Sequence, residues 1–160
     1  MQRKVFSSVI AIGIALTLSA CGPGFDAPTR NIRQVTDGID TEIKTGNSDI
    51  KVRNLVVVTQ ADSSAVLVGS IVNNGTVDDA LLRITIGGVP ATITAANITM
   101  KRNDVIRFEG DSSNAKAVSE GVNLVAGSHT SVSLFFGTAG SANAEVLVRS
   151  PEGIYANVTK

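Results

Sequence analysis

The stretch Ile50–Val58, IKVRNLVVV, decides the fold class of this chain. It begins with an alternation of apolar and polar residues, in which Ile50 and Val52 are the apolar members, and it ends in the continuous apolar run Leu55–Val58. A short run that is this rich in β-branched residues is typical of a buried β-strand.

Stretches of the same kind follow along the chain, separated by turn residues about every 8–12 positions. They are Ala65–Val72, Leu82–Ile86, Ala91–Ile98, Asp104–Phe108, Val122–Val125, Val132–Phe136, Val146–Val148 and Ile154–Val158, with a polar loop expected over Asp111–Lys116. No segment shows a sustained helical repeat. The pattern therefore predicts an all-β chain, an antiparallel β-sandwich of immunoglobulin-like size. We expect its core to include Val56, Val58, Ile84, Leu134 and Val146.

Composition excludes several classes of function. The chain has 160 residues with 14 basic and 14 acidic side chains, and a chain that begins at Cys21 loses two basic residues and no acidic ones, which leaves a net charge of about −2. That balance does not fit a nucleic-acid-binding protein, and with 4% aromatic residues there is no platform on which bases could stack. One His and one Cys exclude a disulfide within the chain and most zinc sites built by protein side chains.

The first twenty residues have the features of a bacterial signal peptide. A short basic segment, Met1–Lys4, precedes the apolar run Val5–Leu18, which is shorter than the roughly 20 residues that span a bilayer as a helix. Leu18-Ser19-Ala20-Cys21 then resembles the lipobox of bacterial lipoproteins. That resemblance implies cleavage between Ala20 and Cys21 and a diacylglyceryl group on the Cys21 thiol. The alternative is a free cysteine after an ordinary secretory signal.

The predicted organisation follows from these features. Residues 1–20 are the lipoprotein signal peptide, expected to be helical, and residues 21–47 are the lipidated N-terminus and a flexible tether, since Gly and Pro are frequent in Gly22–Arg30. Residues 48–160 are the β-sandwich domain. We expect the protein to be held by its lipid on the extracytoplasmic face of the cell membrane, because acyl chains add about 0.8 kcal/mol of membrane affinity for each buried methylene.

Few residues are candidates for chemistry. His129 lies beside Gly127 and is either a metal ligand or an exposed turn residue, and Met100 is either a soft ligand or part of the core. The adjacent carboxylates Asp78 and Asp79 could bind a hard cation or serve a hydrolase, although solvated charges explain them more simply. No catalytic set emerges, so we predict that the protein is not an enzyme.

Several segments resemble one known family. They are Ile50–Asn54, the Asn73-Asn74-Gly75 turn with Asp78–Leu82, the C-terminal block of Val125–Gly127, Val132–Phe136, Ala139-Gly140 and Glu145–Val148, and the ending Gly153–Ala156. Together with the lipobox, these segments are similar to actinobacterial lipoproteins of the LpqE type, which in turn resemble the periplasmic copper chaperone (PCuAC) domain. The resemblance covers the chain from about Val35 to its C-terminus.

The resemblance implies a cupredoxin-like or immunoglobulin-like sandwich and, in the copper chaperones, a Cu(I) site made by a His, a Met and a later His-x-Met pair. This chain departs from that pattern. Between Ile86 and Arg102 it has no His and only Met100, and between Phe108 and Val125 it has neither His nor Met. Since Cu(I) needs two to four soft ligands, the copper-ligand motif is not retained.

Two functions remain open from the sequence. The first is a non-enzymatic, lipid-anchored binding or accessory domain, whose partners are the membrane and a protein of the cell envelope and whose only prosthetic group is the lipid on Cys21. The second is a copper-handling protein with a degenerate or non-standard site, for which Met100 and His129 are the only candidate ligands.

Overall fold

The computed structural model describes residues 37–160. Its strands are β1 (Ile39–Thr45), β2 (Ser48–Thr59), β3 (Ala65–Asn73), β4 (Asp79–Ile86), β5 (Val89–Pro90), β6 (Thr92–Ala95), β7 (Thr99–Met100), β8 (Val105–Phe108), β9 (Ala115–Ser119), β10 (His129–Phe136) and β11 (Ser141–Arg149), and a short 3₁₀ helix, η3, spans Gly153–Tyr155. The predicted all-β class is confirmed. The predicted signal helix, the lipidated cysteine and most of the tether lie outside the described residues.

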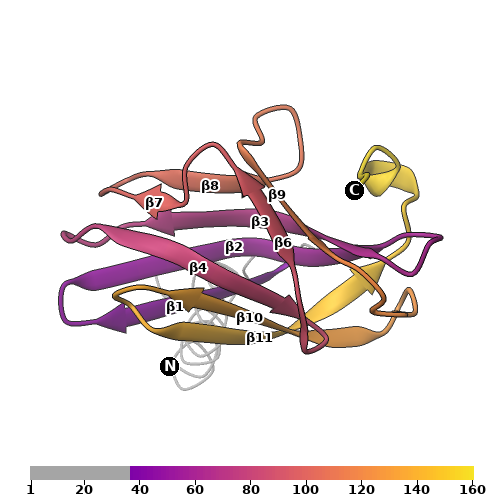
Figure 1. The fold of residues 1–160 in the computed structure, drawn as a ribbon, viewed down its shortest axis with the longest axis horizontal. Helices are drawn as coiled ribbons and strands as arrows, with labels where there is room; N and C mark the ends of the chain where they lie inside the picture. Colours follow the sequence, from indigo (N-terminus) through magenta and orange to yellow (C-terminus); the bar gives the residue numbers. More distant parts are fainter. Residues whose placement is uncertain (1–36) are drawn as a thin grey trace, which may run out of the picture. The chain divides into compact units, whose positions relative to one another are not determined.

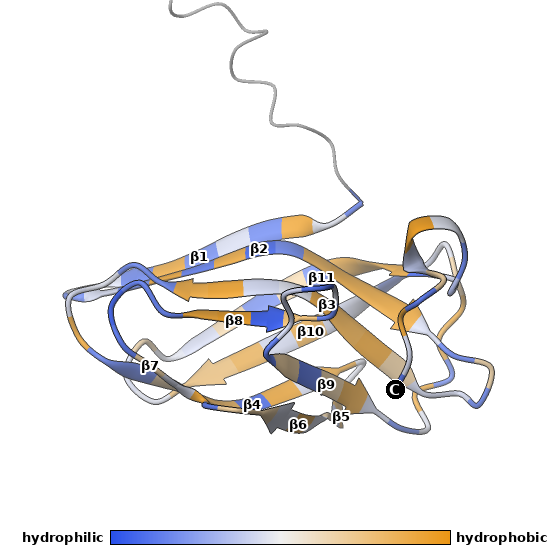
Figure 2. Ribbon diagram, turned by 90° about the horizontal axis from the view of Figure 1, so that it is seen from above, coloured by the Kyte–Doolittle hydropathy of each residue, from blue (hydrophilic) through white to orange (hydrophobic). Residues whose placement is uncertain are grey.

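The strands form one sheet that folds over on itself. Along its main path the order is β5-β4-β10-β11-β2-β3-β8-β9-β6, with β1 added beside β2 and β7 beside β4. In Figure 1, β4 crosses in front of β2, and the view from above in Figure 2 shows two layers on opposite sides of the molecule, one with β1 and β2 and the other with β4, β5 and β6. Pairing is antiparallel except between β2 and β11 and between β8 and β9, which are parallel.

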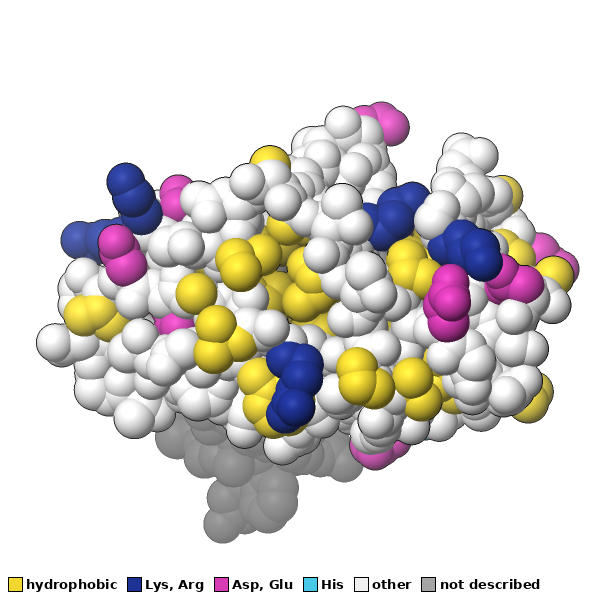
Figure 3. Space-filling view, in the orientation of Figure 1, with side chains coloured by type: hydrophobic (Ala, Val, Ile, Leu, Met, Phe, Trp, Pro, Cys, Tyr) yellow, Lys and Arg dark blue, Asp and Glu magenta, His cyan; other side chains and the backbone are white. Residues whose placement is uncertain are grey.

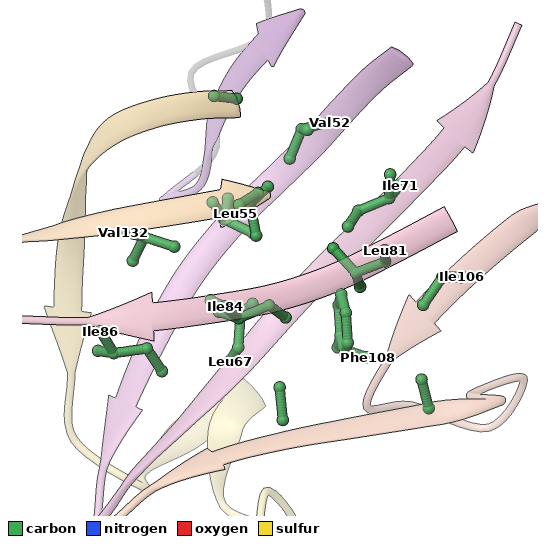
Figure 4. Packing of buried hydrophobic residues seen from close by; sticks show 14 of the residues in the cluster. Val52, Leu55, Leu67, Ile71, Leu81, Ile84, Ile86, Ile106, Phe108 and Val132 are labelled. Carbon is green, nitrogen blue, oxygen red and sulfur yellow. The ribbon is translucent and has the colours of Figure 1, made fainter. Parts of the chain in front are cut away.

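The core lies between the two layers and draws on nearly every strand. Val56, Val58, Ile84, Leu134 and Val146 are each at most 1% exposed, as predicted. Figure 4 shows residues of β2, β3, β4 and β8 converging in this space. Val56 and Val58, however, belong to a second, smaller cluster with Val66, Tyr155 and Val158. Alternation along β2 explains the division, because successive side chains point to opposite faces of a sheet.

The structure corrects three local predictions. Residues 122–125 form no strand, since Gly121 and Asn123 both have positive φ (70° and 48°) and break the extended backbone. The segment predicted as a strand at Ile154–Val158 instead contains η3 and a turn. Conversely, β9 begins at Ala115, inside the predicted polar loop. Its small alanines carry little hydrophobic signal but pair with β6 and face the core.

The predicted boundary between tether and domain, at residue 48, is too late. Strand β1 begins at Ile39 and pairs with β2 from Ile39↔Leu55 to Thr45↔Ser48. Most of its residues are exposed and five are charged or hydroxylic, so the segment resembles a linker in composition. Only pairing with β2 reveals it as a strand, which is common for strands at the side of a sheet.

Candidate functional site

The adjacent carboxylates Asp78 and Asp79 have different environments and make no joint site. Asp79 is 5% exposed, and its carboxylate accepts hydrogen bonds from the backbone N–H groups of Ala80, Thr138 and Ala139, each at 2.8 Å. Asp78 is exposed. The carboxylate of Asp79 is therefore engaged in holding the turn between β10 and β11, where it satisfies backbone donors that strand pairing leaves open.

The structure separates the two candidate copper ligands. Met100 is 0% exposed, lies in the main core and pairs with Asp79 at the start of β4, whereas His129 is exposed at the start of β10. Because the start of β4 lies beside the end of β10, at the Leu81↔Phe136 pair, the length of β10 separates them, roughly 20 Å at 3.4 Å per residue. No single ion can contact both side chains.

The two segments in which the copper chaperones would carry their ligands do lie side by side. They contain β6 and β9, which pair from Thr92↔Val118 to Ala95↔Ala115. Their side chains are those of Thr, Ile, Ala, Lys, Val and Ser, and none is a soft metal ligand. No histidine is visible on the face that carries these strands, where hydrophobic side chains gather near the middle (Figure 3). Among the described residues, no three His, Cys, Asp or Glu side chains could hold a metal ion together.

The C-terminal segment packs on the outer face of the sheet, away from the main core. Tyr155 and Val158 cover Val56, Val58 and Val66 of β2 and β3. Since a 3₁₀ helix has three residues per turn, the spacing of Tyr155 and Val158 puts both side chains on the side that meets the sheet. The backbone of the segment is tied down by Gln60 Nε2, which donates to Val158 O at 3.2 Å, and by Lys116 Nζ, which donates to Thr159 O at 2.7 Å.

The phenol of Tyr155 joins this segment to the start of the domain. Its hydroxyl donates to Asp37 Oδ2 at 3.3 Å, and the same carboxylate oxygen is 3.4 Å from Nε of Arg149. Burial raises the pKa of Tyr155 above its ordinary value, and the nearby charge of Asp37 raises it further. The last residue is held as well, because the Lys160 ammonium pairs with Asp62 and lowers the pKa of that carboxyl.

Two adjoining cavities on this outer face form what we call the outer groove. One, of about 460 Å³, lies against the C-terminal segment and is lined by Val68, Glu109, Gly110, Asp111, Ile154, Tyr155, Asn157 and Val158. The other, of about 220 Å³, is lined by Arg53, Asn54, Val68, Gly69, Ser70, Arg107, Phe108 and Glu109. Val68 and Glu109 line both cavities, so the two lie next to each other.

A row of polar residues crosses the floor of the smaller cavity. Arg53 of β2 pairs with Ser70 of β3, which pairs in turn with Arg107 of β8. All three lie in one register and on one face, so the two arginines are about 10 Å apart at Cα, one strand spacing on either side of Ser70. Arg53 is oriented by donation from Nη1 to Val52 O at 3.0 Å and by Asp40, whose Oδ2 is 3.7 Å from Nε. The Arg107 side chain makes no hydrogen bond or ion pair within residues 37–160.

A β-bulge lies in the floor of the groove. The β2–β3 register shifts between Arg53 and Val56, and Asn54 there has φ of 52°. Opposite the bulge, Gly69 has φ of 139°, and a Cβ at that position would lie 3.0 Å from two backbone carbonyl oxygens of β2. Glycine is required here because the two backbones approach so closely that a side chain would meet β2.

Glu109 occupies the junction of the two cavities in a strained conformation. Its φ of 63° lies in the left-handed region, which costs a non-glycine residue of order 1 kcal/mol or more. Its side chain is 13% exposed, and Oε1 is buried and accepts no hydrogen bond. Lys116 Nζ lies 3.3 Å from Oε1 as an ion-pair partner but directs its hydrogen bond to Thr159 O instead. Oε1 is therefore enclosed beside Lys116, while other atoms of Glu109 line both cavities.

A further surface feature lies on the opposite layer. Leu82 sits at an irregularity in the β4–β10 register and is 60% exposed. Beside it, the guanidinium of Arg83 stacks on the ring of Phe135 at 4.1 Å from the centroid. A cavity of about 560 Å³ lies above these residues.

Comparison with solved structures identifies relatives of this architecture. The apo PCuAC domain from PmoF1 superimposes with a TM-score of 0.56 at 21% identity, over 69% of this chain and 100% of that one. The copper-bound PCuAC domain from PmoF2 gives 0.56 at 16% identity, over 69% and 99% of the two chains. The described domain has the PCuAC fold. The comparison with protein-family models found no match, and that with curated proteins found none either.

The PCuAC likeness confirms the fold that the sequence resemblance implied. It concerns the arrangement of the strands, since fold and site are separate properties. The relation to LpqE-type lipoproteins stays a prediction. So does lipidation of Cys21, which lies outside the described residues together with Ala20 and the cleavage site. Within residues 37–160, no helix is long and apolar enough to cross a membrane.

Sequence reasoning missed the outer groove. Arg53, Ser70 and Arg107 come from three strands and are separated by long stretches of sequence, so nothing in the local pattern links them. Glu109 and Tyr155 are also unremarkable in sequence. Alternation does predict that Arg53 faces away from its buried neighbour Val52, but only the strand register brings it into line with Arg107.

Proposed function

We propose that this protein is a non-enzymatic binding domain held by a lipid on the extracytoplasmic face of a bacterial membrane. The observation that carries the binding role is the outer groove, which is lined by Arg107 and Glu109 and in which the Arg107 side chain makes no hydrogen bond or ion pair with the described residues. Strain at a residue such as Glu109 is typical of binding sites, where a favourable contact with a ligand compensates for it. The basic segment, the apolar run and the lipobox support the anchor.

The anchor is tested by replacing its acyl acceptor. The full chain with Cys21→Ser should leave the membrane fraction and appear in the soluble extracytoplasmic fraction, whereas a His129→Gln chain should stay with the membrane. Because two or three acyl chains hold a protein almost permanently, the wild-type chain should resist a high-salt wash. A Cys21→Ser chain that still sediments with membranes after that wash would refute the lipid anchor.

Copper handling is the second candidate, and a specific observation supports it: a PCuAC domain of similar fold, from PmoF2, is copper-bound. A Cu(I) competition titration of the chain, beside Met100→Ala and His129→Ala, separates the two functions. Tight one-to-one binding that either variant abolishes would establish a copper site unlike that of the copper chaperones. Under the proposal made here, Cu(I) affinity is no greater than that of an unrelated protein with one exposed His.

A protein of the cell envelope remains a proposed partner. The exposed Leu82 and the stacked pair of Arg83 and Phe135 combine apolar area with an oriented cation, a composition that is frequent where proteins meet. Crosslinking from a residue introduced at Ser133, on the same outward face, should capture such a partner, and the Leu82→Asp change should reduce the yield of that product.

A further inference from the structure

The outer groove carries charge and apolar surface in a fixed order. At one end, Arg53 and Arg107 flank Ser70. In the middle, the acidic residue Glu109 lines both cavities. At the other end, Val68, Ile154 and Tyr155 supply apolar walls, with Ile154 84% exposed at the mouth. A ligand that matches this order has an anion, a nearby hydrogen-bonding cation and an apolar part.

We infer that the outer groove binds the phosphoethanolamine headgroup of a membrane phospholipid. The inference rests on the proposed binding role but not on the lipid anchor. The phosphate lies over Ser70 between the two arginines, and the ammonium meets Glu109. The glycerol and the first part of the acyl chains lie against Val68 and Ile154.

The arginine row suits a phosphate. Guanidinium groups present a rigid fork of N–H donors that matches phosphate oxygens. Arg53 has donors left after its contact with Val52 O, since a guanidinium carries five N–H groups. Arg107 has all of its donors free within the described residues. Two long side chains whose Cα atoms are about 10 Å apart can converge on one group between them, and the Ser70 hydroxyl adds a donor below it.

Glu109 distinguishes an ethanolamine from a choline headgroup. The next outward row on β3 after Ser70 is at Val68, about 7 Å along the strand, and Glu109 lies beside it in the groove. A two-carbon bridge from the phosphate places an ammonium in this region. A primary ammonium has three N–H donors and can donate to the part of the Glu109 carboxylate that lines the groove, whereas a trimethylammonium has none. A choline headgroup would displace water from this carboxylate without donating a hydrogen bond in its place, which is costly.

Other carboxylates around the groove are accounted for. Asp40 lies beside Arg53 and fixes its position, and Asp111 lines the larger cavity, where it adds to the attraction for the ammonium. Lys116 neutralises part of the charge of Glu109. The groove therefore offers cations and anions in nearly equal number, which favours a zwitterion over a purely anionic lipid.

The test uses the segment Thr36–Lys160, which forms a compact unit, contains the whole hydrophobic core and lacks Cys21. Its amide NMR signals are followed during titration with dihexanoyl-phosphatidylethanolamine below the micelle concentration. The comparison probes are the phosphatidylcholine and phosphatidylglycerol of the same chain length and glycerophosphoethanolamine, which has the headgroup but no chains. We expect shifts at Gly69, Ser70, Gly110 and Ile154, and affinity at least about fivefold higher for the ethanolamine lipid than for each other probe.

Two variants and a control assign the contacts. Arg107→Gln should weaken binding of the ethanolamine and choline lipids alike, by at least about fivefold, because it removes a charged contact to the phosphate they share. Glu109→Gln should bring the two lipids to within about twofold of each other, because the carboxylate that accepts a charge-assisted hydrogen bond from the ammonium, and from no trimethylammonium, is lost. Arg102 is an exposed arginine outside the groove, so Arg102→Gln should change the affinity for neither the ethanolamine lipid nor the choline lipid.

Several results would overturn the inference, and none depends on the anchor. Equal binding of the ethanolamine and choline lipids by the wild-type segment refutes the role of Glu109 without any variant. If phosphatidylglycerol binds more tightly than the ethanolamine lipid, the preference for a zwitterionic headgroup is refuted. If glycerophosphoethanolamine binds as tightly as the ethanolamine lipid, the site takes a free headgroup rather than a membrane lipid. Failure of the titration leaves the anchor intact, whereas retention of a Cys21→Ser, Arg107→Gln chain on membranes contradicts the anchor alone, because that chain lacks both the acyl acceptor and the phosphate contact.

Discussion

Replacing Asp79 should destabilise the domain strongly even though the residue lies in no catalytic site. Its carboxylate accepts backbone hydrogen bonds at 2.8 Å from Thr138 and Ala139, across the sheet, and from its neighbour Ala80. A hydrogen bond to a charged group contributes roughly 1.5–3 kcal/mol to stability. The two cross-strand bonds together suggest 3 kcal/mol or more, less what water can restore at the exposed turn. We expect Asp79→Ala to lower the free energy of unfolding by about 3 kcal/mol.

Urea unfolding followed by circular dichroism measures this loss, and Asp78→Ala is the matched control. Asp78 is exposed, and the backbone carbonyl that it offers to Thr138 survives the substitution, so its effect should stay within about 0.5 kcal/mol. The loss of unfolding free energy for Asp79→Asn should fall between those for Asp78→Ala and Asp79→Ala, since the amide keeps one acceptor oxygen but places an NH₂ group against a backbone donor. A loss below about 1 kcal/mol for Asp79→Ala, at an unchanged m-value, would show that the turn does not depend on this carboxylate.

Three further predictions concern Tyr155, Gly69 and the core. Because Tyr155 is the only tyrosine of the chain, absorbance at alkaline pH reports its phenol alone: the pKa should lie above the ordinary 10.0, mainly through burial, and Asp37→Asn should lower it part of the way. The raised pKa means that the folded state favours the protonated phenol. The stability that this phenol contributes is therefore complete below pH 10 and is lost as the pH rises through the folded-state pKa. If Tyr155→Phe leaves the dependence of stability on alkaline pH unchanged, this reasoning is wrong. Gly69→Ala should cost more than about 1 kcal/mol in urea unfolding, because the new Cβ meets two carbonyl oxygens at 3.0 Å. Ile84→Ala should cost about 2–5 kcal/mol because Ile84 is 0% exposed, and a cost near that of a surface change would place it outside the core.

The all-β class followed from the sequence because strand-forming stretches are local signals. The run Leu55–Val58 and the alternation of Ile84 and Ile86 depend only on neighbouring residues, and both were buried as expected. The absence of retained copper ligands could also be predicted, since the identity of a residue needs no structure. The distance between two residues in space could not be predicted in the same way. Met100 and His129 were the two candidate ligands in the sequence, but the register of β4 and β10 puts them at opposite ends of a strand.

The errors had local causes as well. β9 was missed because the side chains that it turns to the main core are alanines, whose burial depends on β6 lying beside them. The segment around Tyr155 was predicted as a strand because its apolar residues are close in sequence, but Gly153, with φ of 59°, turns the chain and a 3₁₀ turn serves better to cover the valines beneath.

The sequence alone determined which residues can be buried and which chemical groups the chain possesses, because burial follows hydrophobic periodicity and composition is a property of the chain itself. The signals that we propose for export and lipidation likewise belong to the linear sequence. The tertiary structure alone decided which groups meet. Arg53, Ser70 and Arg107 share one row because three strands adopt a particular register, and Glu109 faces the groove because its backbone turns left-handed beside them. A binding site depends on such distances, and strand register, set by packing across the whole core, is not encoded in any one segment.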